Sequence, residues 1–278
     1  MRRFYANIGE MTLKLLNFLL ITLIAGRAWA AADGRGNPEG PQKLALIQST
    51  KVPPADRVVV MRGRGTVRDA ENLNSGVLFY IEYEHQARSG RPVSTVIRQL
   101  DVNGKTLVLE NTTYTPDGQF KKYLMEQFQT NEKAVVEVVQ GKILMTWTAD
   151  GESKTATAEA KNNSVASGAL MAYMNGFISD LGAGRSLPVE LVVPERSSVF
   201  NFDIAPRSAN CETQKQDLCV SLTMSNFFLQ KLVKPIQMSF QKAPDGWRPL
   251  SLQAPALVRK TSGKNFEKFT ARIDYPRL

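Results

Sequence analysis

Short segments of alternating apolar and polar residues fill the stretch 57–160, and turn-forming residues separate them. In the segment 77–85, Phe79 and Tyr83 fall on one face of an extended chain and Glu82 falls on the other. A period of two residues is typical of a strand with one buried face. The strands predicted in this way are 57–68, 77–85, 93–102, 105–115, 118–130, 133–139, 142–149 and 152–160.

Tight-turn sequences join these strands. They include Asn103-Gly104, Pro116-Asp117-Gly118, Gln140-Gly141 and Asp150-Gly151. Such pairs favour hairpins, so the strands should form one long antiparallel meander. Because open twisted sheets do not extend indefinitely, a meander of this length must curl or close into a barrel.

One segment has helical periodicity instead. Ser164 is a suitable N-cap and Gly182 a suitable C-terminal stop, so we predict a single amphipathic helix over 164–182. Its apolar residues recur at spacings of three and four: Leu170, Tyr173, Met174, Phe177 and Leu181. Its small residues predict close packing against the concave side of the sheet.

Strands resume after this helix, and no linker separates the two halves. The predicted elements are strands 187–193, 197–206, 217–224, 235–242, 247–253 and 266–275, with a short helix at 226–233. The fold class is therefore mainly β: a long antiparallel meander, curled into an open or closed barrel and packed around one helix. We expect a single domain over 57–278.

The first 30 residues have the pattern of a cleavable signal peptide. Arg2, Arg3 and Lys14 precede the apolar run 15–24, and Ala28-Trp29-Ala30 places small residues where signal peptidase cleaves. The run is shorter than the roughly 20 residues that span a bilayer. We therefore expect cleavage after Ala30, no transmembrane anchor afterwards, and a periplasmic protein. Met11 is an alternative start, and Gly- and Pro-rich residues 31–56 predict a flexible leader.

Charge and cysteine content limit the partners. Removing residues 1–30 takes away four of the 35 basic groups and one of the 26 acidic groups, which leaves a net charge of +6. In an exported protein this excess points to anionic lipids or acidic proteins rather than nucleic acid, or simply to solubility. Cys211 and Cys219 are predicted to form a disulfide that closes a short surface loop.

The sequence shows no convincing catalytic, metal or cofactor site. His85 is the only histidine and is interpreted as a rim or core residue. Ser239 and Lys242 have the spacing of a serine acyltransferase motif, but they lie in a predicted strand, where residues three apart face opposite sides. Glu82 and Glu84 share a strand face and are interpreted as ordinary outer-surface residues.

Two groups of residues are candidates for ligand binding. Aromatic and methionine side chains predicted to face inward would either fill a core or line an apolar cavity. The lining candidates are Phe79, Tyr83, Trp147, Met174, Phe177 and Met238. A basic rim, or alternatively a charged edge that opposes aggregation, is expected from Arg62, Arg64, Arg68, Lys260 and Lys264, with Arg259 and Lys268 nearby.

The order of these elements resembles a family of uncharacterised periplasmic domains of Gram-negative bacteria with lipocalin-like barrels. It also looks like the half-barrel carriers that take lipoproteins to the outer membrane. The likeness rests on the helix 164–182 leading into Leu187-Pro188-Val189, and on Lys234-Pro235-Ile236 followed by 245–250. It implies a curved sheet around a helix with an apolar interior, and it assigns no functional residue.

We therefore expect a non-enzymatic periplasmic protein that binds or carries an apolar or amphiphilic ligand, such as a lipid or acyl chain. One alternative is a structural or assembly protein of the cell envelope, with a fully packed core and an envelope protein as its partner. Another is a hydrolase whose site the sequence does not reveal.

Overall fold

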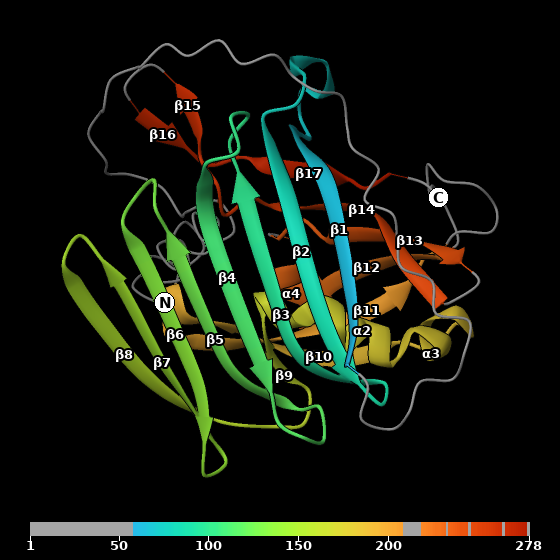
Figure 1. Cartoon of the computed structure of the whole chain (residues 1–278). Helices are drawn as coiled ribbons and strands as arrows, with labels where there is room; N and C mark the ends of the chain where they lie inside the picture. The colour runs from blue at the N-terminus through green and yellow to red at the C-terminus, as the bar shows by residue number, and fades with distance from the viewer. Residues whose placement is uncertain (1–57, 208–217, 232, 244–245, 263–264, 277–278) are drawn as a thin grey trace, which may run out of the picture.

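A computed structural model describes residues 58–207, 218–231, 233–243, 246–262 and 265–276. Its strands form one 15-stranded sheet and a separate two-stranded ribbon (Figure 1). The strands of the first half are β1 (Val58–Asp69), β2 (Phe79–Arg88), β3 (Arg91–Leu100), β4 (Thr106–Tyr114), β5 (Phe120–Gln127), β6 (Glu132–Val139), β7 (Lys142–Ala149) and β8 (Glu152–Glu159). The prediction of a mainly β, antiparallel meander is confirmed.

The second half adds more strands to the same sheet. They are β9 (Ser164–Ala166), β10 (Leu187–Val193), β11 (Ser198–Pro206), β12 (Leu218–Met224), β13 (Ile236–Ala243), β14 (Gly246–Pro255) and β17 (Thr270–Asp274). The strand order is β8-β7-β6-β5-β4-β3-β2-β1-β17-β14-β13-β12-β11-β10-β9, so β1 and β17 join the two halves. Pairing is antiparallel throughout this sheet except between β9 and β10, which are parallel.

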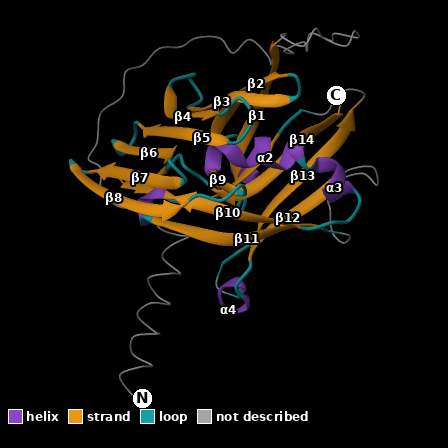
Figure 2. Ribbon diagram, turned by 90° about the horizontal axis from the view of Figure 1, so that it is seen from below, coloured by secondary structure: helices purple, strands orange, loops and turns teal. Residues whose placement is uncertain are grey.

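The sheet is rolled because its two outermost strands are neighbours in sequence. β8 ends at Glu159 and β9 begins at Ser164, and a connection of that length spans at most about 18 Å. The two edges of the sheet therefore come close at this end, although β8 and β9 do not pair with each other. The result is an open roll in which one half of the sheet faces the other (Figure 2).

Two-residue turns fix the hairpins. Gln140 and Gly141 have φ values of 50° and 75°, and Asp150 and Gly151 have 53° and 82°. Positive φ at both central residues matches the right-handed twist of the flanking strands. These turns hold β6, β7 and β8 in a register that places Ala134, Met145 and Ala156 on one face.

The predicted helix over 164–182 is wrong in its extent and continuity. Residues 164–166 form β9, and the helical part consists of η2 (Ser167–Ala169), α2 (Leu170–Gly176) and α3 (Ile178–Gly182). Instead of capping a helix, Ser164 Oγ donates a hydrogen bond to Glu190 Oε2 at 2.9 Å, and its backbone pairs with β10. Phe177, at φ −119° and ψ 16°, interrupts the helix between α2 and α3.

The helical segment lies between the two halves of the sheet. Figure 2 shows α2 between the strands of the first half and those of the second. An added Cβ at Gly168 would lie 2.7 Å from Thr112 Oγ1 on β4 and 3.1 Å from the Tyr123 ring on β5, so η2 is docked directly on the concave face. Leu170, Met174 and Leu181 belong to the same buried apolar core as the inward side chains of both halves.

The remaining elements are short. They are η1 (Leu73–Ser75), η3 (Pro194–Arg196), α4 (Phe227–Gln230), β15 (Lys260–Ser262) and β16 (Asn265–Glu267). The predicted strand 266–275 is wrong in continuity, because β16 pairs with β15 in a separate ribbon and only β17 joins the main sheet. The predicted helix 226–233 is reduced to the single turn α4.

Candidate functional site

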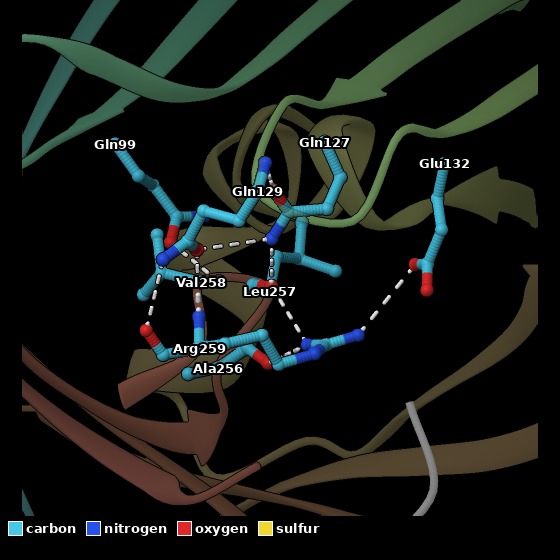
Figure 3. A network of polar contacts seen from close by, with 8 residues as sticks. All are labelled: Gln99, Gln127, Gln129, Glu132, Ala256, Leu257, Val258 and Arg259. Atoms are coloured by element: carbon cyan, nitrogen blue, oxygen red, sulfur yellow. Dashed lines mark hydrogen bonds and ion pairs between the residues drawn. The ribbon is translucent and has the colours of Figure 1, made fainter. Parts of the chain in front are cut away.

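The chain between β14 and β17 leaves the main sheet and reaches the far side of the roll. Its first residues, 256–259, meet the end of β5, and Ala256 and Val258 are buried there. A buried segment outside a sheet must find partners for its backbone N–H and C=O groups. Side chains of the first half of the sheet supply them (Figure 3).

Three glutamines hold this crossing segment. Gln127 Nε2 donates to the carbonyl of Leu257 at 2.8 Å, and the backbone N–H of Val258 donates to Gln99 Oε1 at 3.4 Å. Gln129 binds Arg259 twice: its Nε2 donates to the carbonyl at 3.0 Å, and its Oε1 accepts from the backbone N–H at 2.9 Å. Since an amide side chain has the same donor and acceptor as a peptide group, Gln129 pairs with Arg259 as a strand residue would.

Arg259 carries a buried charge at this position. Its side chain is 1% exposed, and its Nη1 donates to the carbonyls of Leu257 at 2.7 Å and Ala256 at 3.3 Å. Its Nη2 lies 3.6 Å from Glu132 Oε2 at the start of β6. Within the described residues, neither Nε nor Nη2 has a hydrogen-bond partner. Burial lowers the pKa of Arg259, although a guanidinium keeps its proton in proteins.

The charges of other side chains affect the pKa values of Arg259 and of its ionisable neighbours. Burial raises the pKa of Glu195 in η3, and the positive charge of Lys268 opposes that rise. Burial lowers the pKa of Lys268 to about 7. The negative charge of Glu195 opposes this shift, and the positive charge of Arg259 adds to it. Arg196 follows Glu195 in sequence, and its positive charge lowers the pKa values of both Glu195 and Lys268. We call Glu132, Glu195, Arg196, Arg259 and Lys268 the charged cluster.

A second polar group lies farther along the concave face. Glu110 Oε2 accepts hydrogen bonds from Tyr123 Oη at 2.9 Å and from Ser167 Oγ at 3.1 Å. Gln99 also hydrogen-bonds to Glu110, and through its contact with Val258 it links this group to the crossing segment. Burial raises the pKa of Glu110, which favours its neutral form, while these hydrogen bonds oppose the shift.

His85 lies in a different set of contacts. Its Nδ1 is 2.9 Å from Thr95 Oγ1, which is 3.2 Å from the hydroxyl of Tyr114. Burial lowers the pKa of His85, so the neutral ring is favoured at neutral pH. Ser239, whose spacing to Lys242 was set aside as a catalytic motif, lies in β13 as predicted, with its Oγ 2.6 Å from Ser251 Oγ on β14.

The structure distributes the predicted lining residues along the roll. Phe79, Trp147, Met174 and Met238 are buried in the core, and Phe79 packs on Phe269 with ring centroids 6.0 Å apart. Tyr83 meets Tyr275 edge to face at 5.8 Å. Phe177 differs, because it is 41% exposed and packs on Tyr173 at the break between α2 and α3.

The predicted basic rim does not gather unbalanced positive charge. Its described members face acidic side chains: Arg62 Nε to Glu84 Oε2 at 2.9 Å, Arg64 Nε to Glu82 Oε1 at 3.8 Å, Arg68 Nη1 to Asp274 Oδ2 at 3.6 Å, and Lys260 Nζ to Asp69 Oδ2 at 2.9 Å. Lys264 lies outside the described residues. The three arginine pairs are partly or largely exposed, and pairs of this kind contribute at most about 1 kcal/mol each, whereas the Asp69 side chain of the lysine pair is buried.

The described residues also bear on the cysteines, on metal binding and on membrane-spanning helices. Cys219 is disulfide-bonded, and Cys211, the other cysteine of the chain, lies outside the described residues. Among those residues, no three acidic, histidine or cysteine side chains group in a way that could hold a metal ion. None of the helices in the described part of the chain is long and apolar enough to cross a bilayer.

The charged cluster and the glutamine contacts were not predicted as a site. The sequence places Arg259 and Lys268 near the predicted basic rim or charged edge, whereas the structure buries the Arg259 side chain and the Lys268 Nζ. The available signal was the apolar sequence Ala256-Leu257-Val258 directly before Arg259. The three glutamines lie 130 residues or more before their partners, a separation at which sequence spacing gives no information.

The fold and these contacts define an open antiparallel β-roll with a polar group and a charged cluster set into an apolar interior. No protein-family model matches the sequence, and no curated protein matches it. Among solved structures, it is similar to a beta-barrel-like protein of Domain of Unknown Function DUF1849 from Brucella abortus. The TM-score is 0.46 and the identity 11%, over 81% of this chain and 98% of that chain.

Proposed function

We propose that this is a non-enzymatic periplasmic protein that binds an apolar or amphiphilic ligand, such as a lipid acyl chain, on the concave face of its rolled sheet. The supporting observation is the mixture of groups on that face. Ligand sites are mostly apolar with a few convergent polar groups. Here Thr112 Oγ1, Arg259 Nε and Lys268 Nζ are buried next to the apolar core and have no hydrogen-bond partner within the described residues.

A packed interior without such a role would satisfy nearly all of these atoms internally. The open edge between β8 and β9 adds a second supporting feature, since the sheet is not sealed there by strand pairing. Export to the periplasm is part of the proposal and depends on the signal-peptide pattern of residues 1–30, which lie outside the described residues.

One observation favours the alternative of an envelope scaffold with a packed core. Met174 and Met238, both lining candidates, are 0% and 3% exposed. Interiors are close-packed, so buried lining residues are also what a solid core would show. A ligand would then have to displace flexible methionine side chains, which adapt readily to varied shapes.

Native mass spectrometry of protein purified from the periplasm tests the proposal. We expect a fraction of molecules to carry a lipid-sized adduct, and Trp147→Ala to reduce that fraction because Trp147 is buried in the core, opposite Ala134 in the strand register. The matched control is Leu144→Ala, an exposed apolar residue on the other face of the same strand β7. Bare protein in every preparation, with no uptake of added lipid, would favour the packed scaffold.

A further inference from the structure

The apolar concave face ends at the charged cluster. On β6, Glu132, Ala134 and Val136 alternate onto one face, and Ala134 and Val136 are 0% exposed. Trp147 lies directly opposite Ala134 on β7, in the antiparallel register. An apolar chain lying along this face would therefore reach Glu132 and Arg259 at its end.

The cluster contains more positive than negative groups. Arg196, Arg259 and Lys268 are three basic side chains, against the two acidic side chains of Glu132 and Glu195, and Lys268 carries its charge below about pH 7. Charges taken out of water are costly unless they are paired and hydrogen-bonded. Within the described residues, three donor atoms of the cluster, Arg259 Nε and Nη2 and Lys268 Nζ, have no hydrogen-bond acceptor, whereas one acceptor atom, Glu132 Oε2, has no donor. Glu132 Oε2 lies 3.6 Å from Arg259 Nη2, so even this ion pair leaves unpaired donors in excess.

An anionic oxygen of a ligand would be the hydrogen-bond acceptor that these donors lack. Carboxylates accept bonds from guanidinium and ammonium groups, and such charge-assisted bonds are about twice as strong as neutral ones. We infer that the ligand is an acyl chain with an anionic head, a carboxylate, which Arg259 and Lys268 bind while the chain lies against Trp147. This inference rests on the proposed function and adds the chemical class of the head group.

Titration of the full mature chain with dodecanoate and with dodecanol tests the inference. Because both molecules have the same chain, the proposed function alone predicts similar affinities. We expect dodecanoate to bind at least about tenfold more tightly, the equivalent of one charge-assisted contact. Lys268→Met should remove most of that difference and leave dodecanol binding unchanged within about twofold. Lys142→Met, an exposed lysine at the start of β7, is the control and should change neither.

The same titration has a pH arm. Lys268 has a pKa of about 7, so it is charged below that pH and neutral above it. Glu195, with its pKa raised by burial, becomes negative as pH rises. Both changes weaken the binding of a carboxylate. The affinity for dodecanoate should therefore fall as the pH rises from about 6 to about 9, and it should fall less in Lys268→Met. Glu132, Arg196 and Arg259 also act on Lys268, and both guanidinium groups stay charged throughout this range. Dodecanol, which has no charge, should show no such trend.

Two results would overturn the inference, and only one of them would also overturn the proposed function. Equal binding of dodecanoate and dodecanol to the native protein would reject the anionic head and leave the proposed function intact. Binding of neither molecule would reject both. If Lys268→Met fails to fold, the comparison of the two ligands on the native protein still decides the question, because it needs no variant.

Discussion

Replacing Gly168 with valine is expected to destabilise the protein by about 3 kcal/mol, at the upper end of what overpacking costs. Gly168 lies in η2, where even a Cβ atom would approach Thr112 Oγ1 to 2.7 Å and the Tyr123 ring to 3.1 Å. Tyr123 is buried and bonded to Glu110 and Ser167, so its ring has little freedom to move. Chemical denaturation monitored by circular dichroism measures the effect.

The control for this variant is Gly176→Val, in the same helical segment. Apart from its chain neighbours and the backbone of its own helix, an added Cβ at Gly176 meets no atom within 4 Å. Valine is also a better helix former than glycine, so stability should stay within about 0.5 kcal/mol of the native value. Equal effects of the two substitutions would show that η2 is not docked on the concave face.

Phe240→Ala is expected to cost about 3–5 kcal/mol of unfolding free energy, because it removes a large side chain from the core and leaves a cavity. Phe240 lies in β13 at 0% exposure, at a register shift next to Ser239. For a domain of this size, such a loss lowers the melting temperature by roughly 6–20 °C. Differential scanning calorimetry gives the melting temperature directly.

Phe228→Ala is the matched substitution on the surface. Phe228 lies in α4 and is 78% exposed. Because it buries little apolar surface, its removal should change stability by no more than about 0.5 kcal/mol. A large loss at Phe228, or a negligible one at Phe240, would contradict the assignment of β13 to the shared core of the roll.

The strands were predictable because each carries its own local signal. Alternation gives the face of each strand, and pairs such as Gln140-Gly141 give the turns. The curl follows from the same pattern, since fifteen twisted strands cannot stay flat. That the roll stays open depends on the lack of pairing between β8 and β9, and alternation carries no information about it.

The helical segment shows where local signals fail. Its apolar spacing correctly placed Leu170, Met174 and Leu181 in the core. The start was misplaced because Ser164, a good N-cap by type, instead bonds to Glu190 and pairs with β10. Tertiary contacts with a residue 26 positions away thus overrode the capping preference, and the sequence offers no local sign of that competition.

The candidate site was the least predictable part of the molecule. Its glutamines look like ordinary polar residues in sequence, and only the crossing of the chain from β14 turns them into partners for a buried backbone. Arg259 and Lys268 look like ordinary exposed basic residues in sequence, because only the same crossing of the chain buries them. Long-range closure of the roll creates this site, so neither composition nor spacing could identify it.

Diffraction from crystals of the protein grown with ω-bromododecanoate tests the central claim most directly, because anomalous scattering locates the bromine without interpretation of weak chain density. We expect a bromine position on the concave face between the two halves of the sheet, with the carboxylate toward Arg259 and Lys268. Bromine found only on the convex outer surface, or no bound ligand at saturating concentration, would contradict it.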